Sequence, residues 1–199
     1  MSDPQRTQPR MTIEEFLVWD DGSGISYELF EGRPIPRHVE FVNGRPVAQA
    51  APAAEHAAIV ANLGGALWNR LRPPCRAFSE VGIAVSDRDD TWYQADIAVS
   101  CTEGRIAGAM LPNPVLVVEV SSPGTAGKDE GPKLTDYCAI PSVQAVLLVA
   151  IDRPEARLIR RVADHWEIEF LRGPDAAARL PFLDVELPLS EIYRGAAFD

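Results

Sequence analysis

Hydrophobic residues recur along the chain in two spacings, which predict a mixture of helices and strands. Over residues 53–72 they stand three and four positions apart, and Pro73-Pro74 follows, as expected for a long amphipathic helix. The runs 115–120 and 143–151 are almost continuously apolar, which is typical of central strands covered on both faces. We therefore expect these runs to be adjacent strands, joined through a helix near residues 132–139.

Shorter elements surround this centre. The capping-box sequence Thr12-Ile13-Glu14-Glu15 predicts a short helix, and residues 27–35 and 39–47 nearly repeat one another as two hairpins. Pro34 and Pro46 lack an amide donor, which moves the returning arms to a sheet edge. Further strands are expected over 78–85, 92–100, 157–162 and 166–171, and a last helical turn over 189–193.

The order of these elements predicts an α/β (α+β) fold with a mixed central sheet and with N-terminal β-hairpins. We expect a disordered tail over residues 1–10 and a single domain over 11–199. The length of 199 residues, with 46% hydrophobic and 24% charged residues, fits one globular domain that buries a core.

Charge and cysteine content restrict the classes of function. The formal net charge of −10 opposes a general, non-specific affinity for nucleic acid. The polar N-terminus and the lack of a long apolar run predict neither export nor membrane insertion. Three cysteines without metal-binding spacing are interpreted as small core residues of a cytoplasmic protein, with no disulfide framework: Cys75, Cys101 and Cys138.

Two acidic residues, Asp96 and Glu119, each stand inside a strand-like run, where an unpaired carboxylate is costly to bury. A period-two count puts Glu119 and Ser121 on one polar face, and Gln94 and Asp96 on another. If the two strands are neighbours in register, the carboxylates lie a few ångströms apart. A divalent cation would relieve their repulsion.

Lysine is rare in this chain, because only Lys128 and Lys133 are lysines among its 19 basic residues. Lys133 falls in the first turn of the expected helix, on the same face as Tyr137. Its compact ammonium group can orient a water molecule or stabilise a developing negative charge. Two carboxylates, a divalent ion and a lysine-held water suit in-line attack on a phosphodiester.

Motifs in a specific order extend over residues 11–193: Tyr27-Glu28-Leu29 with Gly32, Glu55-His56, Pro74-Cys75-Arg76, Tyr93-Gln94-Ala95-Asp96, 117–123, 129–133 and Tyr137. In this order and spacing they resemble the bacterial Uma-two family, within the PD-(D/E)XK superfamily of restriction-endonuclease-like proteins. The resemblance implies a restriction-endonuclease-like fold, a mixed central sheet flanked by helices. It also implies a metal-dependent endonuclease that hydrolyses DNA, with Asp96 and Glu119 binding Mg²⁺ or Mn²⁺ and Lys133 as the catalytic lysine. The residues expected to line the site are Glu28, Glu40, His56, Gln94, Ser121 and Tyr137.

The chain departs from the family pattern at three places. Ala95 replaces the proline that usually precedes the first aspartate. Ser121 stands two residues after Glu119, where the superfamily's plain motif has lysine, so the lysine's role is transferred to Lys133. The repeated hairpin leaves Glu28 and Glu40 as candidates for the N-terminal glutamate of the site, and the preceding Tyr27 favours Glu28.

Other functions stay open at this point. A non-catalytic, nuclease-like module that binds DNA or protein agrees better with the negative charge, and a hydrolase of small phosphate esters would use the same residues. The two acids could instead form a structural pair bridged by arginines. Because superfamily enzymes often act on two strands, we also expect a homodimer, with the repeated hairpins as its contact surface. Four arginines form either a basic stripe for DNA or a solvated sheet face: Arg153, Arg157, Arg160 and Arg161.

Overall fold

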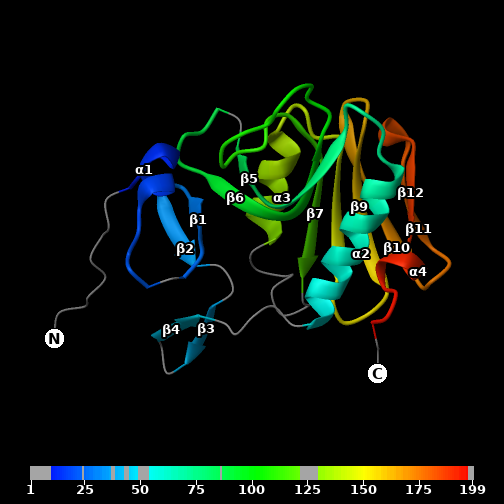
Figure 1. Cartoon of the computed structure of the whole chain (residues 1–199), viewed down its shortest axis with the longest axis horizontal. Helices are drawn as coiled ribbons and strands as arrows, with labels where there is room; N and C mark the ends of the chain where they lie inside the picture. The colour runs from blue at the N-terminus through cyan, green and yellow to red at the C-terminus, as the bar shows by residue number, and fades with distance from the viewer. Residues whose placement is uncertain are drawn as a thin grey trace.

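A large mixed sheet forms the centre of the protein (Figure 1). In this computed structural model, residues 10–23, 25–36, 39–42, 45–48, 54–85, 87–121 and 130–196 are described, with 39–42, 45–48 and 130 described by their backbone alone. The strands of the large sheet are β1 (Tyr27–Phe30), β2 (Arg33–Pro36), β5 (Arg76–Ala84), β6 (Trp92–Ser100), β7 (Pro114–Ser121), β8 (Ala145–Ala150), β9 (Glu155–Val162) and β10 (His165–Arg172). Their order is β10-β9-β8-β7-β6-β1-β2, and β5 pairs with β6 outside that order.

Two small antiparallel sheets and several helices complete the described part of the chain. They are the pair β3 (Val39–Val42) and β4 (Arg45–Ala48), the pair β11 (Ala177–Leu180) and β12 (Val185–Pro188), the helices α1 (Ile13–Val18), α2 (Ala54–Arg70), α3 (Glu130–Ala139) and α4 (Leu189–Ile192), and a 3-10 helix at Pro181–Leu183. The predicted α+β class, with a mixed central sheet and N-terminal hairpins, is confirmed.

The two apolar runs are adjacent parallel strands, as predicted. β7 pairs with β8 in parallel from Leu116↔Ala145 to Ser121↔Ala150, and α3 lies between them in the sequence. Every other pairing in the large sheet is antiparallel among the described strands. The parallel pair therefore places the C-terminal end of β7 next to the helix that follows it.

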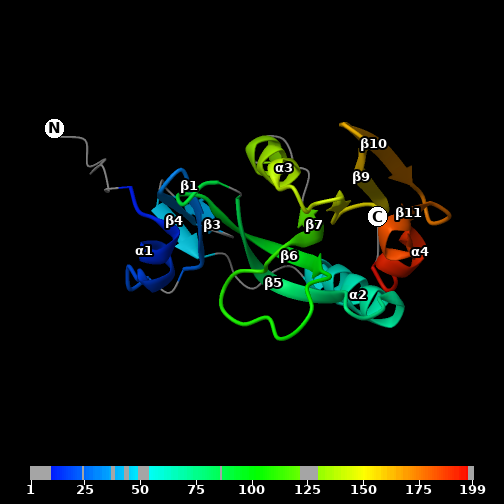
Figure 2. The same cartoon turned by 90° about the horizontal axis from the view of Figure 1, so that it is seen from above.

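The two faces of the sheet are covered by different elements. Figure 2 shows α2 and α3 on opposite sides of β7. The α2 side carries a large apolar cluster to which α4 and the β11–β12 pair also contribute. Asn62 of α2 donates hydrogen bonds to the carbonyls of Ile192 and Arg194, and Arg70 forms an ion pair of 2.6 Å with Glu191. These contacts fix the C-terminal elements against α2.

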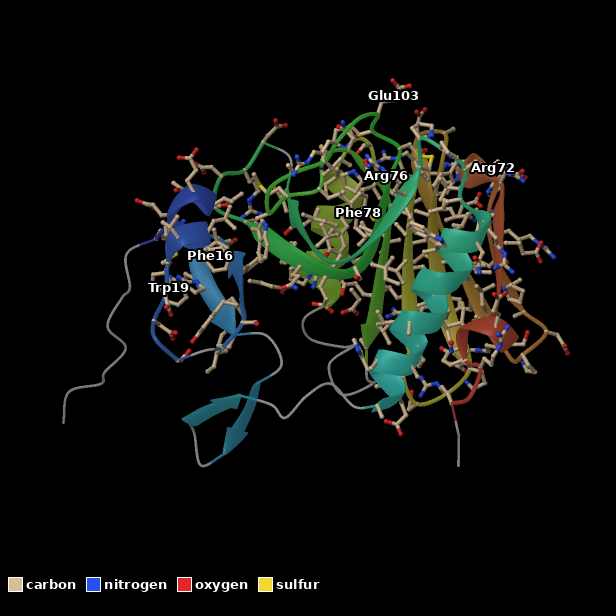
Figure 3. The ribbon with its side chains drawn as sticks, in the orientation of Figure 1. Phe16, Trp19, Arg72, Arg76, Phe78 and Glu103 are labelled. Atoms are coloured by element: carbon tan, nitrogen blue, oxygen red, sulfur yellow. A yellow bond between two sulfur atoms is a disulfide. The ribbon has the colours of Figure 1, made fainter. Side chains whose placement is uncertain are left out.

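The N-terminal segment forms a small aromatic cluster against the end of the sheet. Thr12 and Glu15 form the predicted capping box of α1. Phe16 and Trp19 extend from α1 toward the strands (Figure 3), and the Phe16 ring lies 5.4 Å from that of Trp92. β2, which contains Pro34, is an edge strand as predicted. The tail predicted over 1–10 lies outside the described residues apart from residue 10.

The expectation for the cysteines is wrong for two of the three. Cys75 and Cys101 form a disulfide, while Cys138 is a free, half-buried thiol. The cause is the β5–β6 pairing, in which Arg76 stands opposite Ser100, so the flanking cysteines face each other. A separation of 26 residues gives no such signal in the sequence. No helix in the described ranges is long and apolar enough to cross a membrane.

Candidate active site

Three residues from distant parts of the sequence meet at one ammonium group. The Nζ of Lys133, on α3, lies 2.8 Å from Oε1 of Glu28 on β1 and 3.1 Å from Oε1 of Glu119 on β7. All three side chains are largely buried. The structure therefore brings together two of the three residues predicted as catalytic, together with the favoured N-terminal glutamate.

The helix α3 presents a second donor to the same carboxylate. Tyr137 lies one turn after Lys133 on the same helical face, and its hydroxyl donates a hydrogen bond of 2.7 Å to Oε1 of Glu119. The tyrosine ring is fully buried in the α3-side core. One oxygen of Glu119 thus has both a cationic and a neutral donor, which fixes the carboxylate's orientation.

Burial dominates the electrostatics of Glu119. Loss of solvent raises the pKa of Glu119 to about 7, since the opposing effect of Lys133 and the hydrogen bond from Tyr137 do not fully offset the cost of a buried charge and the repulsion from Asp96. Burial and the nearby carboxylates also raise the pKa of Tyr137 well above its ordinary value. Glu119 is therefore poised to change charge near neutral pH.

Asp96 lies where β6 and β7 separate. Their pairing ends at Ile97↔Val118, and beyond it Oδ2 of Asp96 accepts a hydrogen bond of 2.7 Å from the backbone N–H of Val120. The same oxygen lies 3.4 Å from Nε2 of His56, a buried residue in the first turns of α2. At this point the Asp96 side chain, and not a backbone carbonyl, accepts the hydrogen bond from β7. Asp96 is therefore bonded directly to the strand that carries Glu119.

The predicted period-two alternation does not hold through Asp96. Ala95 and Ala98 both pack in the α3-side cluster, whereas Ile97 packs in the α2-side cluster. The irregularity coincides with Glu80 on β5, which has a left-handed backbone (φ 50°) between the paired positions Ser79↔Ile97 and Val81↔Ala95. Asp96 contacts His56 of α2 and lies near enough to Glu119 to raise its pKa, while Glu119 accepts a hydrogen bond from Tyr137 of α3.

The remaining predicted lining residues differ in their placement. Gln94 donates its backbone N–H to Oε1 of Glu28 at 3.0 Å, while its side-chain amide donates to Glu80 at 2.7 Å. Ser121 is the last residue of β7, half-buried and two positions after Glu119. Glu40 lies on β3, but its side chain is outside the described residues, as is Lys128.

A second set of contacts, which the sequence did not indicate, holds α3 over β6. The hydroxyl of Tyr93 donates a hydrogen bond of 2.6 Å to Asp136 of α3, and Arg88 lies 3.6 Å from the other oxygen of Asp136. Burial and the bond to Asp136 raise the pKa of Tyr93. The Tyr93 ring lies 5.4 Å from Nζ of Lys133, so these contacts adjoin the site. The only feature of the sequence that could have indicated a role for Asp136 is its position three residues after Lys133.

The carboxylate oxygens of Asp96 and Glu119 are suitable ligands for a hard divalent cation. Within the described ranges, no group of three or more His, Cys, Asp or Glu side chains is arranged to hold a metal ion. Mg²⁺, however, commonly uses one or two carboxylates and completes its shell with water and substrate phosphate. A buried carboxylate whose pKa is raised beside a second carboxylate is also a place where a cation would favour the ionised form. The residues present therefore fit such an ion.

Comparison with known proteins gives concordant matches. The model of the Uma2 family, described as "putative restriction endonuclease", matches residues 13–190. The uncharacterized protein slr1290 of Synechocystis sp. (strain ATCC 27184 / PCC 6803 / Kazusa) is 26% identical over 198 residues, which cover 98% of this chain and 97% of the relative. A second protein of that organism, sll1609, is 26% identical over 156 residues, covering 73% and 85% respectively.

One solved structure has a similar fold. The crystal structure of a "putative nuclease belonging to DUF820" from Anabaena variabilis ATCC 29413 aligns with a TM-score of 0.65. The alignment covers 92% of this chain and 97% of that chain, at 21% sequence identity. At this identity the likeness concerns the arrangement of helices and strands.

Proposed function

The chain belongs to the Uma2 family of restriction-endonuclease-like proteins, and from this premise we propose that it is a metal-dependent endonuclease that hydrolyses phosphodiester bonds in DNA. The observation that carries the proposal is the contact of Lys133 with Glu28 and Glu119, next to Asp96. A buried lysine beside several acids is costly to build for stability alone. It is well suited to chemistry at a phosphate group.

In this proposal Asp96 and Glu119 hold Mg²⁺ or Mn²⁺. Such an ion, when bound, supplies Lewis-acid stabilisation of the phosphate and lowers the pKa of a water molecule. The backbone N–H of Val120 holds Oδ2 of Asp96, and Tyr137 holds Oε1 of Glu119, so both carboxylates are oriented before substrate arrives. His56 is a positioning residue for Asp96.

Lys133 acts on the oxygen atoms of the reaction. Its ammonium can donate one hydrogen to the attacking water or to a non-bridging phosphate oxygen while Glu28 and Glu119 fix its position. Glu28 is itself held by the backbone N–H of Gln94. The residue that binds the lysine is thus anchored to the same strand, β6, that carries Asp96.

The test is a cleavage assay with Mg²⁺ or Mn²⁺ and a panel of single-stranded, duplex and branched DNA. We expect cleavage by the wild-type protein and by the control variant Glu186→Gln, which removes an acid from β12 on the opposite side of the sheet. Asp96→Ala should be inactive. If the wild-type protein cuts none of these substrates with either ion but binds DNA, the non-catalytic module that its net charge of −10 favours replaces this proposal.

We also propose that the protein acts as a homodimer, because a single site would otherwise have to address two strands in turn. The edge strand β2, with its half-exposed Ile35, is the proposed contact. Light scattering at micromolar concentration tests this directly: twice the mass of the 21.7 kDa chain supports a dimer, and the monomer mass contradicts it.

A further inference from the structure

The strand β10 separates its apolar and acidic residues onto two faces. Leu171 packs into the α2-side core, and Glu167 and Glu169 share its face by alternation. Trp166 packs against the α3-side core, so Ile168 and Phe170 lie on the α3 side. These last two side chains are 56% and 63% exposed. An edge strand thus presents an open apolar stripe to the side of the sheet that Glu119 occupies.

This stripe is continuous with the candidate active site through the strand register. Glu119 stands opposite Leu148, Leu148 opposite Arg157, and Arg157 opposite Phe170. With about 4.8 Å between neighbouring strands, Phe170 is about 15 Å from Glu119 along this row. Figure 2 shows β9 and β10 rising on the α3 side of the sheet, with α2 on the opposite side.

The same face is locally basic, although the whole chain is acidic. Arg157, Arg161 and Arg172 lie on it, and Glu155, 3.6 Å from the Arg172 guanidinium, is the one acid that β9 and β10 contribute there. The Arg172 guanidinium lies 5.9 Å from the Phe170 ring. That of Arg161 lies 4.5 Å from the Trp166 ring but donates hydrogen bonds to the carbonyls of Val143, Cys138 and Ile140, so it holds the face in place and leaves phosphate contacts to Arg157 and Arg172. The glutamates of β10 are on the other face, where Glu169 pairs with Arg160.

Alternating aromatic and cationic side chains suit one kind of ligand. A single-stranded nucleic acid offers unstacked bases to apolar side chains and phosphates to arginines, whereas a duplex hides the faces of its bases. A second copy of this chain is a poorer occupant, because a stable dimer buries about 800 Å² on each partner. Two exposed apolar side chains beside several charges do not offer such a surface.

We propose that the aromatic-arginine face, formed by Arg157, Trp166, Ile168, Phe170 and Arg172, binds a single-stranded segment next to the phosphodiester bond that is cut. This inference rests on the proposed endonuclease function. It adds that the DNA, whether it has one strand or two, is unpaired beside the point where each strand is cut. The row from Glu119 to Phe170 gives the direction in which that strand leaves the site.

Binding can be measured apart from cleavage. The full chain is titrated in EDTA against a fluorescent oligothymidylate, and anisotropy is recorded at several salt concentrations. We expect Phe170→Ala to weaken binding about tenfold, Phe170→Tyr to retain it, and Arg172→Gln to weaken it and reduce its salt dependence. The matched control is Trp68→Ala, because Trp68 is 75% exposed on α2, away from this face, and its loss should leave binding unchanged.

Several results would overturn the proposal. One is an equal loss of oligothymidylate binding with Trp68→Ala and with Phe170→Ala. Another is tighter binding of a duplex of the same length. The third is a Phe170→Ala protein that binds the oligothymidylate as the wild type does but has a lower oligomeric mass, which would make this face a contact between copies of the chain. Phe170-dependent binding without cleavage by the wild-type protein would remove the proposed activity and leave this surface. Cleavage without Phe170-dependent binding would remove this inference alone.

Discussion

The two sides of β7 differ in what they bury, apolar side chains on one and a carboxylate on the other. The side that faces α2 is entirely apolar and buried, with Leu116, Val118 and Val120. The side that faces α3 begins with Val117 in the core and then changes to Glu119 and Ser121. The difference suggests that close packing on one side holds the strand in place so that the other side can keep a buried carboxylate.

The two sides also differ in how they would respond to mutation. An apolar cluster loses stability according to the volume removed, because cavities form when side chains shorten. A buried polar cluster responds to charge, because removing one partner leaves another without compensation. Variants on each side should therefore produce distinct changes in folding and in activity.

The largest expected effect is on the apolar side. Leu116→Ala should lower the free energy of unfolding by about 2–5 kcal/mol, because Leu116 is fully buried in the cluster between the sheet and α2. Urea unfolding followed by circular dichroism measures this. Glu119→Gln, two positions beyond Val117, should change the free energy of unfolding near pH 6 by less than Leu116→Ala does. An equal loss from both variants would mean that the two sides are not functionally divided.

The next effect is on activity and arises on the polar side. Lys133→Met should reduce the cleavage rate by about 10²-fold or more, because it removes the positioned ammonium between Glu28 and Glu119. Single-turnover kinetics on the best substrate measure the rate. Lys128→Met is the control and should retain activity. If both variants lose activity equally, a diffuse positive field and not a positioned group is responsible.

Stability should depend on pH through Glu119 in the metal-free protein. Because the folded protein raises the pKa of Glu119 from an ordinary 4.5 to about 7, the folded state binds a proton that the unfolded state releases. Stability should thus be highest below pH 4.5 with respect to this group and fall as the pH rises toward 7, by about 3 kcal/mol. Urea unfolding in EDTA at several pH values tests this, and Glu119→Gln should lose the dependence.

The smallest expected effect concerns the contacts that hold α3. Tyr93→Phe removes the hydrogen bond to Asp136 and should lower the free energy of unfolding by about 1 kcal/mol. It should reduce cleavage severalfold through kcat, with little change in KM, because Lys133 is displaced and substrate contacts remain. A change in KM alone would assign Tyr93 to substrate binding and contradict a positioning role.

Local sequence signals predicted most of the fold. The capping box at Thr12, the proline at position 34 and the continuous apolar runs act within a few residues, so their consequences follow from propensity and packing alone. The β11–β12 pair was not predicted, because its strands are only four residues each, which is short for a periodicity signal. The disulfide likewise depends on a register that joins residues far apart in sequence.

The candidate site was predictable as a set of residues and less so as a geometry. The resemblance to a family selected Asp96, Glu119 and Lys133, and the tyrosine before Glu28 favoured the glutamate that contacts Lys133. The period-two count failed around Asp96, because Ala95 and Ala98 both pack on the α3 side. Asp136 gave no usable signal, since its partner Tyr93 is 43 residues away.

The scarcity of lysine makes the amine of Lys133 a built-in reporter. Amine-reactive reagents have only Lys128, Lys133 and the N-terminal amine to modify in this chain. Since Glu28 and Glu119 both form ion pairs with the largely buried Lys133 ammonium, its acylation requires that these ion pairs break. The rate of labelling at Lys133, measured by mass spectrometry, therefore reports how often α3 separates from the sheet in the absence of substrate.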